Sequence, residues 1–285
     1  MSKGPIGIFD SGYGGLTILK EITRVLPQYD YIYLGDNARA PYGQRSFETI
    51  YQYTLECVQW FFNQGCPLVI LACNTASAKA LKNIQHFALP HMAPDNRVLG
   101  VIRPTAEVIG HHTQTRQIGI LATTGTVVSG SYLIEVHRSF PELKVFQQAC
   151  PMWVPMVENN EYDNEGADYY IKKYIDALRA QSPDIDTVLM ACTHYPLLVP
   201  KIKKFWPEVN ILSQGPIVAH SLADYLQRHP EIEARIRQHS DYKFYTTDSE
   251  NDFDNRASVF FGETISATHA EIDHTIHITD YSIIA

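Results

Sequence analysis

The chain has 285 residues, of which 45% are hydrophobic and 19% are charged, a composition typical of a globular protein with about two domains. The formal net charge of −8 and the lack of a basic cluster argue against a nucleic-acid partner. There is no signal-peptide pattern and no run of the roughly 20 apolar residues that a membrane span needs, and five scattered cysteines fit reduced thiols, so we expect a cytoplasmic protein without a membrane partner.

Strand-like and helix-like segments alternate along almost the whole chain. Continuous apolar runs, typical of buried parallel strands, occur in chain order at IGIFD, YIYLGD, LVILA, VLGVI, QIGILAT, KVFQQA, TVLMA, VNILS and KFYTTD. Apolar residues follow a helical period over 19–26 and 47–61, and DFDNRASVFFG predicts a last helix. The segment after Gly262 has no clear period and gives no prediction. The alternation predicts an α/β fold with helices on both faces of parallel-rich sheets.

The sequence also contains an internal repeat. The first strand ends in DSGYGG and the strand that begins at Gln117 ends in ATTGT, both small-residue turns that lead into a helix. About 65 residues after each turn, a buried strand ends in Ala-Cys, at Cys73 and again at Cys192. The repeat predicts two pseudo-symmetric halves with a thiol at the equivalent place in each. Ligands of open α/β sheets bind beyond the carboxyl ends of the strands, which is where both cysteines lie.

The paired thiols limit the chemistry that the chain can perform. A single cysteine after a buried strand is often only a small core residue, but two in matched contexts, each at a helix start, indicate reactive thiols. A hydrolase needs one nucleophile and a base, a redox pair normally lies within one loop, and a zinc site of Cys73, Cys192 and His194 lacks a fourth ligand. Inversion of a carbon centre needs a base on one face and an acid on the other. The other cysteines, Cys57, Cys66 and Cys150, are interpreted as structural.

Several polar residues follow the same strand ends. Asp10 and Ser11 come directly after the first strand, where the carboxylate would meet an ammonium group, orient a base, or cap the next helix. Tyr42 and Gly43 either line a pocket or form a plain turn. The turn SGYGG lacks the third glycine of a dinucleotide fingerprint, so nucleotide binding is not expected there.

Polar groups also follow each cysteine. Asn74, Thr75, Thr193 and the N–H groups around them would hold a carboxylate. His194 would tune the Cys192 thiol, and Glu158 is a carboxylate in an unusually apolar loop, CPMWVPMVE.

Taken together, these segments resemble the glutamate racemases of the cofactor-independent aspartate/glutamate racemase superfamily. The resemblance rests on GIFDSGYGGLTILKEI, GDNARAPYGQRS, ACNTASAKAL, GVIRPTA, ILATTGTVVSGSY, CPMWVPMVE, MACTHYPLL and FYTTD with ASVFFG, in that order, over about residues 5 to 262. It implies two flavodoxin-like α/β domains with the active site between them. The first domain would comprise residues 1–98 and 208–285, and the second residues 99–207.

The resemblance also implies an activity and roles for particular residues. Cys73 would deprotonate D-glutamate and Cys192 would deprotonate L-glutamate, without metal or cofactor, to supply D-glutamate for peptidoglycan. Asp10, His194 and Glu158 would assist the thiols. The implied substrate contacts are Asp10, Ser11, Tyr42, Gly43, Asn74, Thr75, Thr123, Thr193 and His194.

Other functions and partners stay open at this point. An aspartate or broad-specificity racemase of the same superfamily is the nearest alternative, and an acidic-ligand sensor without catalysis is another. The resemblance admits a homodimer and an activating cell-wall precursor.

Overall fold

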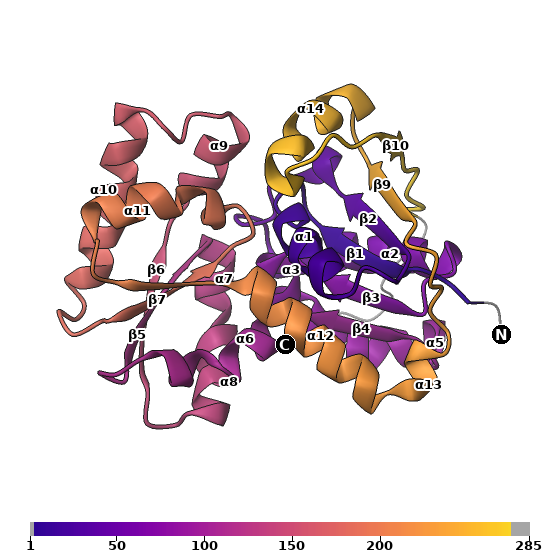
Figure 1. Cartoon of the computed structure of the whole chain (residues 1–285), viewed down its shortest axis with the longest axis horizontal. Helices are drawn as coiled ribbons and strands as arrows, with labels where there is room; N and C mark the ends of the chain where they lie inside the picture. Colours follow the sequence, from indigo (N-terminus) through magenta and orange to yellow (C-terminus); the bar gives the residue numbers. More distant parts are fainter. Residues whose placement is uncertain (1–2, 275–285) are drawn as a thin grey trace.

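The computed structural model describes residues 3–274 and contains two β-sheets with helices packed around them (Figure 1). The first sheet has the strand order β10-β9-β2-β1-β3-β4 and the second has the order β6-β5-β7-β8. All the strand pairs in the two sheets are parallel. The predicted α/β class with parallel sheets is therefore confirmed.

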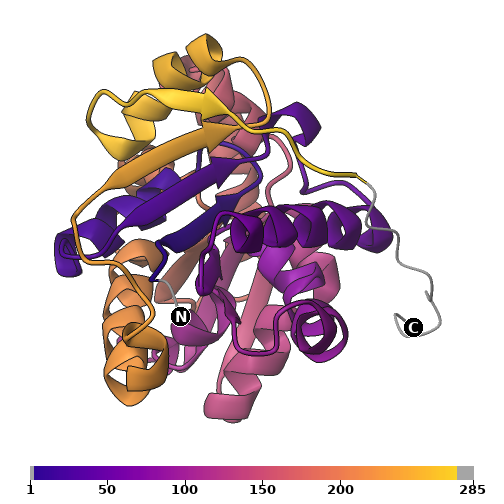
Figure 2. The ribbon, with the colours of Figure 1, turned by 90° about the vertical axis from the view of Figure 1, so that its right-hand side faces the viewer.

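The strands lie where the apolar runs predict them. In the first sheet they are β1 (Ile6–Asp10), β2 (Tyr31–Gly35), β3 (Leu68–Leu71), β4 (Arg97–Gly100), β9 (Tyr242–Thr246) and β10 (Ala267–His269). In the second sheet they are β5 (Gln117–Ala122), β6 (Lys144–Ala149), β7 (Thr187–Ala191) and β8 (Asn210–Ser213). Only β10, in the segment after Gly262, had no counterpart in the sequence pattern, and it lies at an edge of the first sheet, as Figure 2 shows.

The helices fill the connections between the strands. Around the first sheet lie α1 (Leu16–Val25), η1 (Asn37–Arg39), α2 (Phe47–Asn63), α3 (Asn74–Lys79), α4 (Leu81–Asn83), η2 (Ile84–Ala88), α5 (Leu89–Met92), α12 (Gln214–Arg228), α13 (Pro230–Glu233) and α14 (Glu250–Phe261). Around the second lie α6 (Ile102–Ala106), η3 (Ile109–His112), α7 (Thr124–Ser129), α8 (Ser131–Ser139), α9 (Trp153–Glu158), α10 (Glu165–Arg179), η4 (Tyr195–Leu198) and α11 (Val199–Phe205).

Both faces of the first sheet are buried, which explains why its central strands are uniformly apolar. Along β1, Ile6 and Ile8 belong to one core cluster and Phe9 belongs to another. Successive strand side chains point to opposite faces, so the two clusters lie on opposite sides of the sheet. Helix α1 presents Leu19 and Ile22 to the first cluster, and α12 packs against α1.

The chain crosses between the two sheets twice. Strand β4 pairs with β3 in the first sheet, and the chain then enters α6 and the second sheet. Strand β8 pairs with β7 in the second sheet, and α12 returns to the first. We therefore propose domain boundaries close to Gly100 and Ser213. The expected boundary at 98 would divide β4, and the expected boundary at 207 would assign β8 to the first domain, although β8 pairs with β7 of the second sheet.

Candidate active site

A small cavity lies between the two halves, at the carboxyl ends of both sheets. Its volume is about 50 Å³, enough for only a few water molecules. The loops after β1, β2 and β3 form one wall, and those after β5, β6 and β7 form the other. Eleven of the twelve predicted site residues line it: Ser11, Tyr42, Gly43, Cys73, Asn74, Thr75, Thr123, Glu158, Cys192, Thr193 and His194.

Cys73 begins helix α3 on the wall formed by the first half. Its sulfur accepts the Ala76 N–H at 3.5 Å, and its thiol donates to the Ser11 hydroxyl at 3.6 Å. The side chain is only 6% exposed, and burial together with the nearby Asp10 carboxylate raises the thiol pKa to about 12. Cys192, across the cavity, is close enough to contribute to the same shift. Cys73 is therefore mostly protonated at neutral pH.

Cys192 has an ionic neighbour on the wall formed by the second half. Its sulfur lies 3.9 Å from Nδ1 of His194, whose Nε2 lies 3.0 Å from the Glu158 carboxylate. Burial alone would lower the pKa of His194, but the interactions with Cys192 and Glu158 outweigh burial and raise it well above the usual value. The imidazole is therefore protonated at neutral pH and places a positive charge beside the Cys192 sulfur.

Asp10 is the one predicted site residue that lies behind the cavity wall. Its carboxylate is fully buried, accepts the Gly12 N–H at 3.0 Å, and accepts the Thr193 hydroxyl at 3.3 Å. The alternative role as a helix cap is wrong, because Gly15 occupies the N-cap position of α1. Burial raises the Asp10 pKa, although His194 opposes the effect. The carboxylate joins the first half to the loop that carries Cys192 and His194.

The two halves approach closely at Gly14. A Cβ atom at this position would lie 2.3 Å from the Thr193 hydroxyl oxygen and 2.6 Å from His194 Nδ1. A side chain at these distances would require the Thr193 and His194 side chains, or the loop that carries them, to move. Glycine is therefore required at position 14, because there is no room for a Cβ atom.

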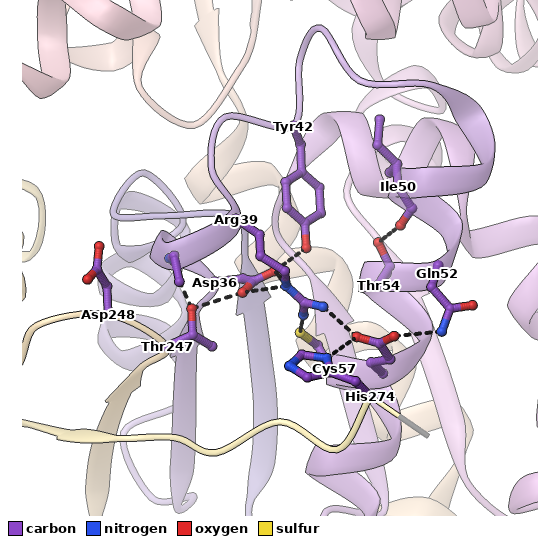
Figure 3. Close-up of polar contacts among 12 residues, drawn as sticks. Asp36, Arg39, Tyr42, Ile50, Gln52, Thr54, Cys57, Thr247, Asp248 and His274 are labelled. Atoms are coloured by element: carbon purple, nitrogen blue, oxygen red, sulfur yellow. Dashed lines mark hydrogen bonds and ion pairs between the residues drawn. The ribbon is translucent and has the colours of Figure 1, made fainter. Parts of the chain in front are cut away.

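The loop that carries Tyr42 is held by a buried ionic cluster (Figure 3). The Tyr42 hydroxyl donates to Asp36, and the Arg39 guanidinium binds both Asp36, at 2.8 Å, and Glu56. Thr247 donates to the second Asp36 oxygen at 2.9 Å. Burial and the Asp36 carboxylate raise the Tyr42 pKa well above its usual value, so the phenol stays neutral. The Tyr42 hydroxyl holds the loop through Asp36, and Tyr42 also forms part of the cavity wall.

The loop also contacts the opposite wall. The Gly43 carbonyl accepts the Gly125 N–H at 2.8 Å, and a Cβ at Gly43 would lie 3.0 Å from the Thr123 side chain. Thr123 in turn shares a hydrogen bond of 3.0 Å with Thr75. These contacts connect the two halves on the side of the cavity that Cys73 occupies.

Sequence reasoning missed part of the cavity wall. Cys150, interpreted as structural, is buried in the wall beside Pro151 and Val154. Cys150 directly follows β6, the second strand of the second half, and this position at a strand end is the signal in the sequence that points to the cavity. Within residues 3–274 no group of His, Cys, Asp and Glu side chains has an arrangement suited to a metal, and no helix there is long and apolar enough to cross a membrane.

Comparisons with known proteins agree on one family. The family model described as Asp/Glu/Hydantoin racemase matches residues 14–221. Glutamate racemase of Sulfurihydrogenibium sp. is 38% identical, over 91% of this chain and 94% of its own, and that of Persephonella marina is 42% identical, over 75% and 79%. Among solved structures, glutamate racemase isoform RacE1 from Bacillus anthracis is 34% identical, with a TM-score of 0.85 over 95% of this chain and 98% of its own.

A second solved structure is that of a complex. Glutamate racemase from Francisella tularensis, in complex with D-glutamate, is 28% identical with a TM-score of 0.82 over 96% of this chain and 98% of its own. On sequence and fold alike, this chain belongs to the Asp/Glu/Hydantoin racemase family, among its glutamate racemases.

Proposed function

We propose that the protein interconverts L- and D-glutamate without a cofactor: one of the thiols of Cys192 and Cys73 removes the α-proton, and the other delivers a different proton to the opposite face. The observation that carries the proposal is the pair of thiols, one from each half, that line a single small cavity. A planar carbanion-like state between them would be reached by one thiol from each face. Only an arrangement of this kind gives inversion without rotation of the substrate or the base.

The proton transfers follow from the surroundings of the two sulfurs. Starting with L-glutamate, the Cys192 thiolate takes the α-proton, so that the Cα–H bond breaks and an S–H bond forms. The Cys73 thiol then gives its proton to the opposite face of Cα. The site is left with a Cys192 thiol and a Cys73 thiolate, which is the form that reacts with D-glutamate or returns to the first form by exchange with solvent.

Hydrogen-bond donors and one imidazolium, rather than lysine or arginine, would bind the two carboxylates. The described residues that line the cavity include neither lysine nor arginine. Backbone N–H groups, including that of Thr193, and the side chains of Asn74 and Thr75 supply donors, and the protonated His194 supplies positive charge. Pre-oriented donors in a water-poor site stabilise developing charge strongly, as removal of a weakly acidic α-proton requires. Asp10 would act from behind the wall, by holding Thr193 and by its charge.

Deuterium incorporation tests the proposal. In deuterated water, L-glutamate should give D-glutamate with deuterium at Cα, while the remaining L-glutamate stays protiated at early times. Proton NMR of the separated enantiomers at less than roughly a tenth of full conversion measures both. Equal early deuteration of substrate and product would contradict the two-thiol mechanism. Relative turnover of glutamate and aspartate separates the main proposal from an aspartate racemase, and glutamate binding without racemisation would indicate a sensor.

We propose three further properties. They are a role in the cytoplasmic supply of D-glutamate for peptidoglycan, a homodimer, and activation by a soluble cell-wall precursor. A second cavity of about 520 Å³, with Lys82, Arg103 and Arg138 in its wall, would accommodate an anionic precursor. Light scattering of the purified protein tests the dimer, and racemisation with and without added precursor tests the activator.

A further inference from the structure

A buried ring of hydrogen bonds lies behind Asn74, on the side away from the cavity. The Asn74 amide nitrogen donates to Gln214 Oε1 at 2.6 Å, the Gln214 amide nitrogen donates to the Tyr132 hydroxyl at 2.8 Å, and Tyr132 donates back to Asn74 Oδ1 at 2.6 Å. Each residue in the ring donates once and accepts once. All three side chains are at most 2% exposed, so the ring is closed to solvent.

The three residues come from different parts of the fold. Asn74 follows Cys73 at the start of α3, Tyr132 lies on α8 of the second half, and Gln214 begins α12 where the chain returns to the first half. The Gln214 amide nitrogen also reaches the Val101 carbonyl at 3.3 Å and the Thr105 hydroxyl at 3.1 Å. Those two residues belong to the other crossover, after β4. The ring therefore lies where both crossovers meet the active-site wall.

Val101 determines the direction in which the ring runs. A carbonyl oxygen only accepts hydrogen bonds, so the Gln214 nitrogen, not its oxygen, must face Val101. Thr105 agrees, because it donates its own proton to the Val101 carbonyl at 2.8 Å and has only an acceptor left for Gln214. With the Gln214 nitrogen on that side, its oxygen faces Asn74 and requires a donor there. Tyr132 then supplies its proton to Asn74 Oδ1.

The result is that Asn74 can offer the cavity only a donor. Its amide oxygen is occupied by Tyr132, and one of its two N–H groups is occupied by Gln214. Within residues 3–274 the second N–H has no protein partner, and Asn74 lines the cavity beside Cys73. An amide that was free to rotate would present its oxygen to a carboxylate part of the time, which is repulsive.

We infer that Tyr132 and Gln214 are positioning residues for the racemase reaction, which hold Asn74 as an obligatory donor to a substrate carboxylate. The inference rests on the proposed function. Neither residue touches the substrate, and neither titrates in the reaction. Their contribution is to substrate binding, so we expect it in KM more than in kcat.

Tyr132→Phe tests the inference, because it removes only the hydroxyl. We expect KM for glutamate to rise by about 10-fold, kcat to change by less than about 3-fold, and the pH profile of kcat to stay unchanged. The matched control is Tyr31→Phe, which removes a buried hydroxyl that donates to the Leu26 carbonyl at 2.8 Å, at the amino end of β2 and away from the cavity. The control should lose a similar amount of thermal stability and keep its KM.

A double-mutant cycle with Asn74→Ala identifies the route of the effect. If Tyr132 acts through Asn74, Tyr132→Phe should raise KM in the wild type and change it by less than about 2-fold in the Asn74→Ala background. Equal effects in both backgrounds, or a KM as unaffected as that of Tyr31→Phe, would overturn the inference. If Tyr132→Phe does not fold, Gln214→Met enters the same cycle with the same expectation. Wild-type enzyme that fails to racemise glutamate would instead refute the proposed function.

Discussion

The two thiols lie at equivalent strand ends, but their surroundings differ. Cys73 has neutral hydrogen-bond partners, Ser11 and the Ala76 N–H, and the Asp10 carboxylate nearby opposes its ionisation. Cys192 lies beside the protonated His194. The repeated fold therefore places two sulfurs symmetrically, while the groups around them differ in charge. We expect Cys73 to rest as the protonated thiol, whereas Cys192 rests beside a positively charged imidazole.

Replacing either cysteine should have the largest effect on the racemisation rate. Cys73→Ala and Cys192→Ala should each lower racemisation by about 10³-fold or more in both directions, because the acid of one direction is the base of the other. Circular dichroism of L- and D-glutamate measures the rates. Cys66→Ala, a change at a buried cysteine outside the cavity, is the control and should stay active. Substantial racemisation by one single-cysteine variant would show that the thiols are not a pair.

Asp10→Asn should lower turnover by about 10²-fold and leave stability unchanged or higher. The folded-state pKa of Asp10 is raised above its unfolded value, so the folded protein binds this proton more tightly and loses stability as pH rises from about 3.8 through the folded pKa. At neutral pH the buried negative charge of Asp10 lowers the stability of the folded protein, and the neutral amide of asparagine removes this destabilisation. Turnover and the thermal midpoint, measured on the same preparation, test both parts. A lower midpoint with near-normal turnover would make Asp10 a purely structural residue.

Alkylation should distinguish the two sulfurs by charge. Both are 6% exposed, so unequal labelling reports reactivity more than access. Because iodoacetamide reacts with thiolates and the pKa of Cys73 is raised, Cys73 should be labelled about 10-fold more slowly than Cys192 at neutral pH. Peptide mass spectrometry of briefly treated enzyme gives the ratio, and saturating glutamate should protect both sites. Faster labelling of Cys73 would contradict the protonated state expected for that thiol.

Glu158→Gln is the smallest expected effect, a decrease of about 3- to 10-fold in kcat/KM. Glu158 helps to raise the His194 pKa, so its loss should move the alkaline limb of the pH profile to lower pH. L- and D-glutamate have equal free energies in water, so kcat/KM must fall equally in both directions. Glu142→Gln, at an exposed position before β6, is the control. An unshifted alkaline limb would mean that Glu158 does not act through His194.

Much of the fold was predictable because it depends on local pattern. Buried parallel strands are uniformly apolar, so nine of the ten strands could be located from the sequence. Strand β10 could not, since it has three residues and is defined by pairing with β9. The cysteine pair was predictable for a similar reason, because each cysteine directly follows a readable strand.

The parts that were not predictable depend on contacts between distant residues. Asp10 has the sequence context of a helix cap, but its hydroxyl partner, Thr193, lies 183 positions away. Tyr132 and Gln214 have no local signal for function, since the ring they form with Asn74 exists only after the two halves have assembled. A pattern within a single segment cannot show which buried polar groups will meet.

Substitutions at Gly14 offer a way to change the distance between the two halves by experiment. The space that its missing side chain leaves is occupied by the Thr193 hydroxyl and the His194 imidazole. A methyl group there would press against these two side chains, which belong to the other half, and larger residues would press further. In a series from Gly14→Ala to Gly14→Val, we expect the contact between the two halves to loosen by increasing amounts. Ligands that bind these variants better than the wild type would be inhibitors that act by keeping the two halves apart.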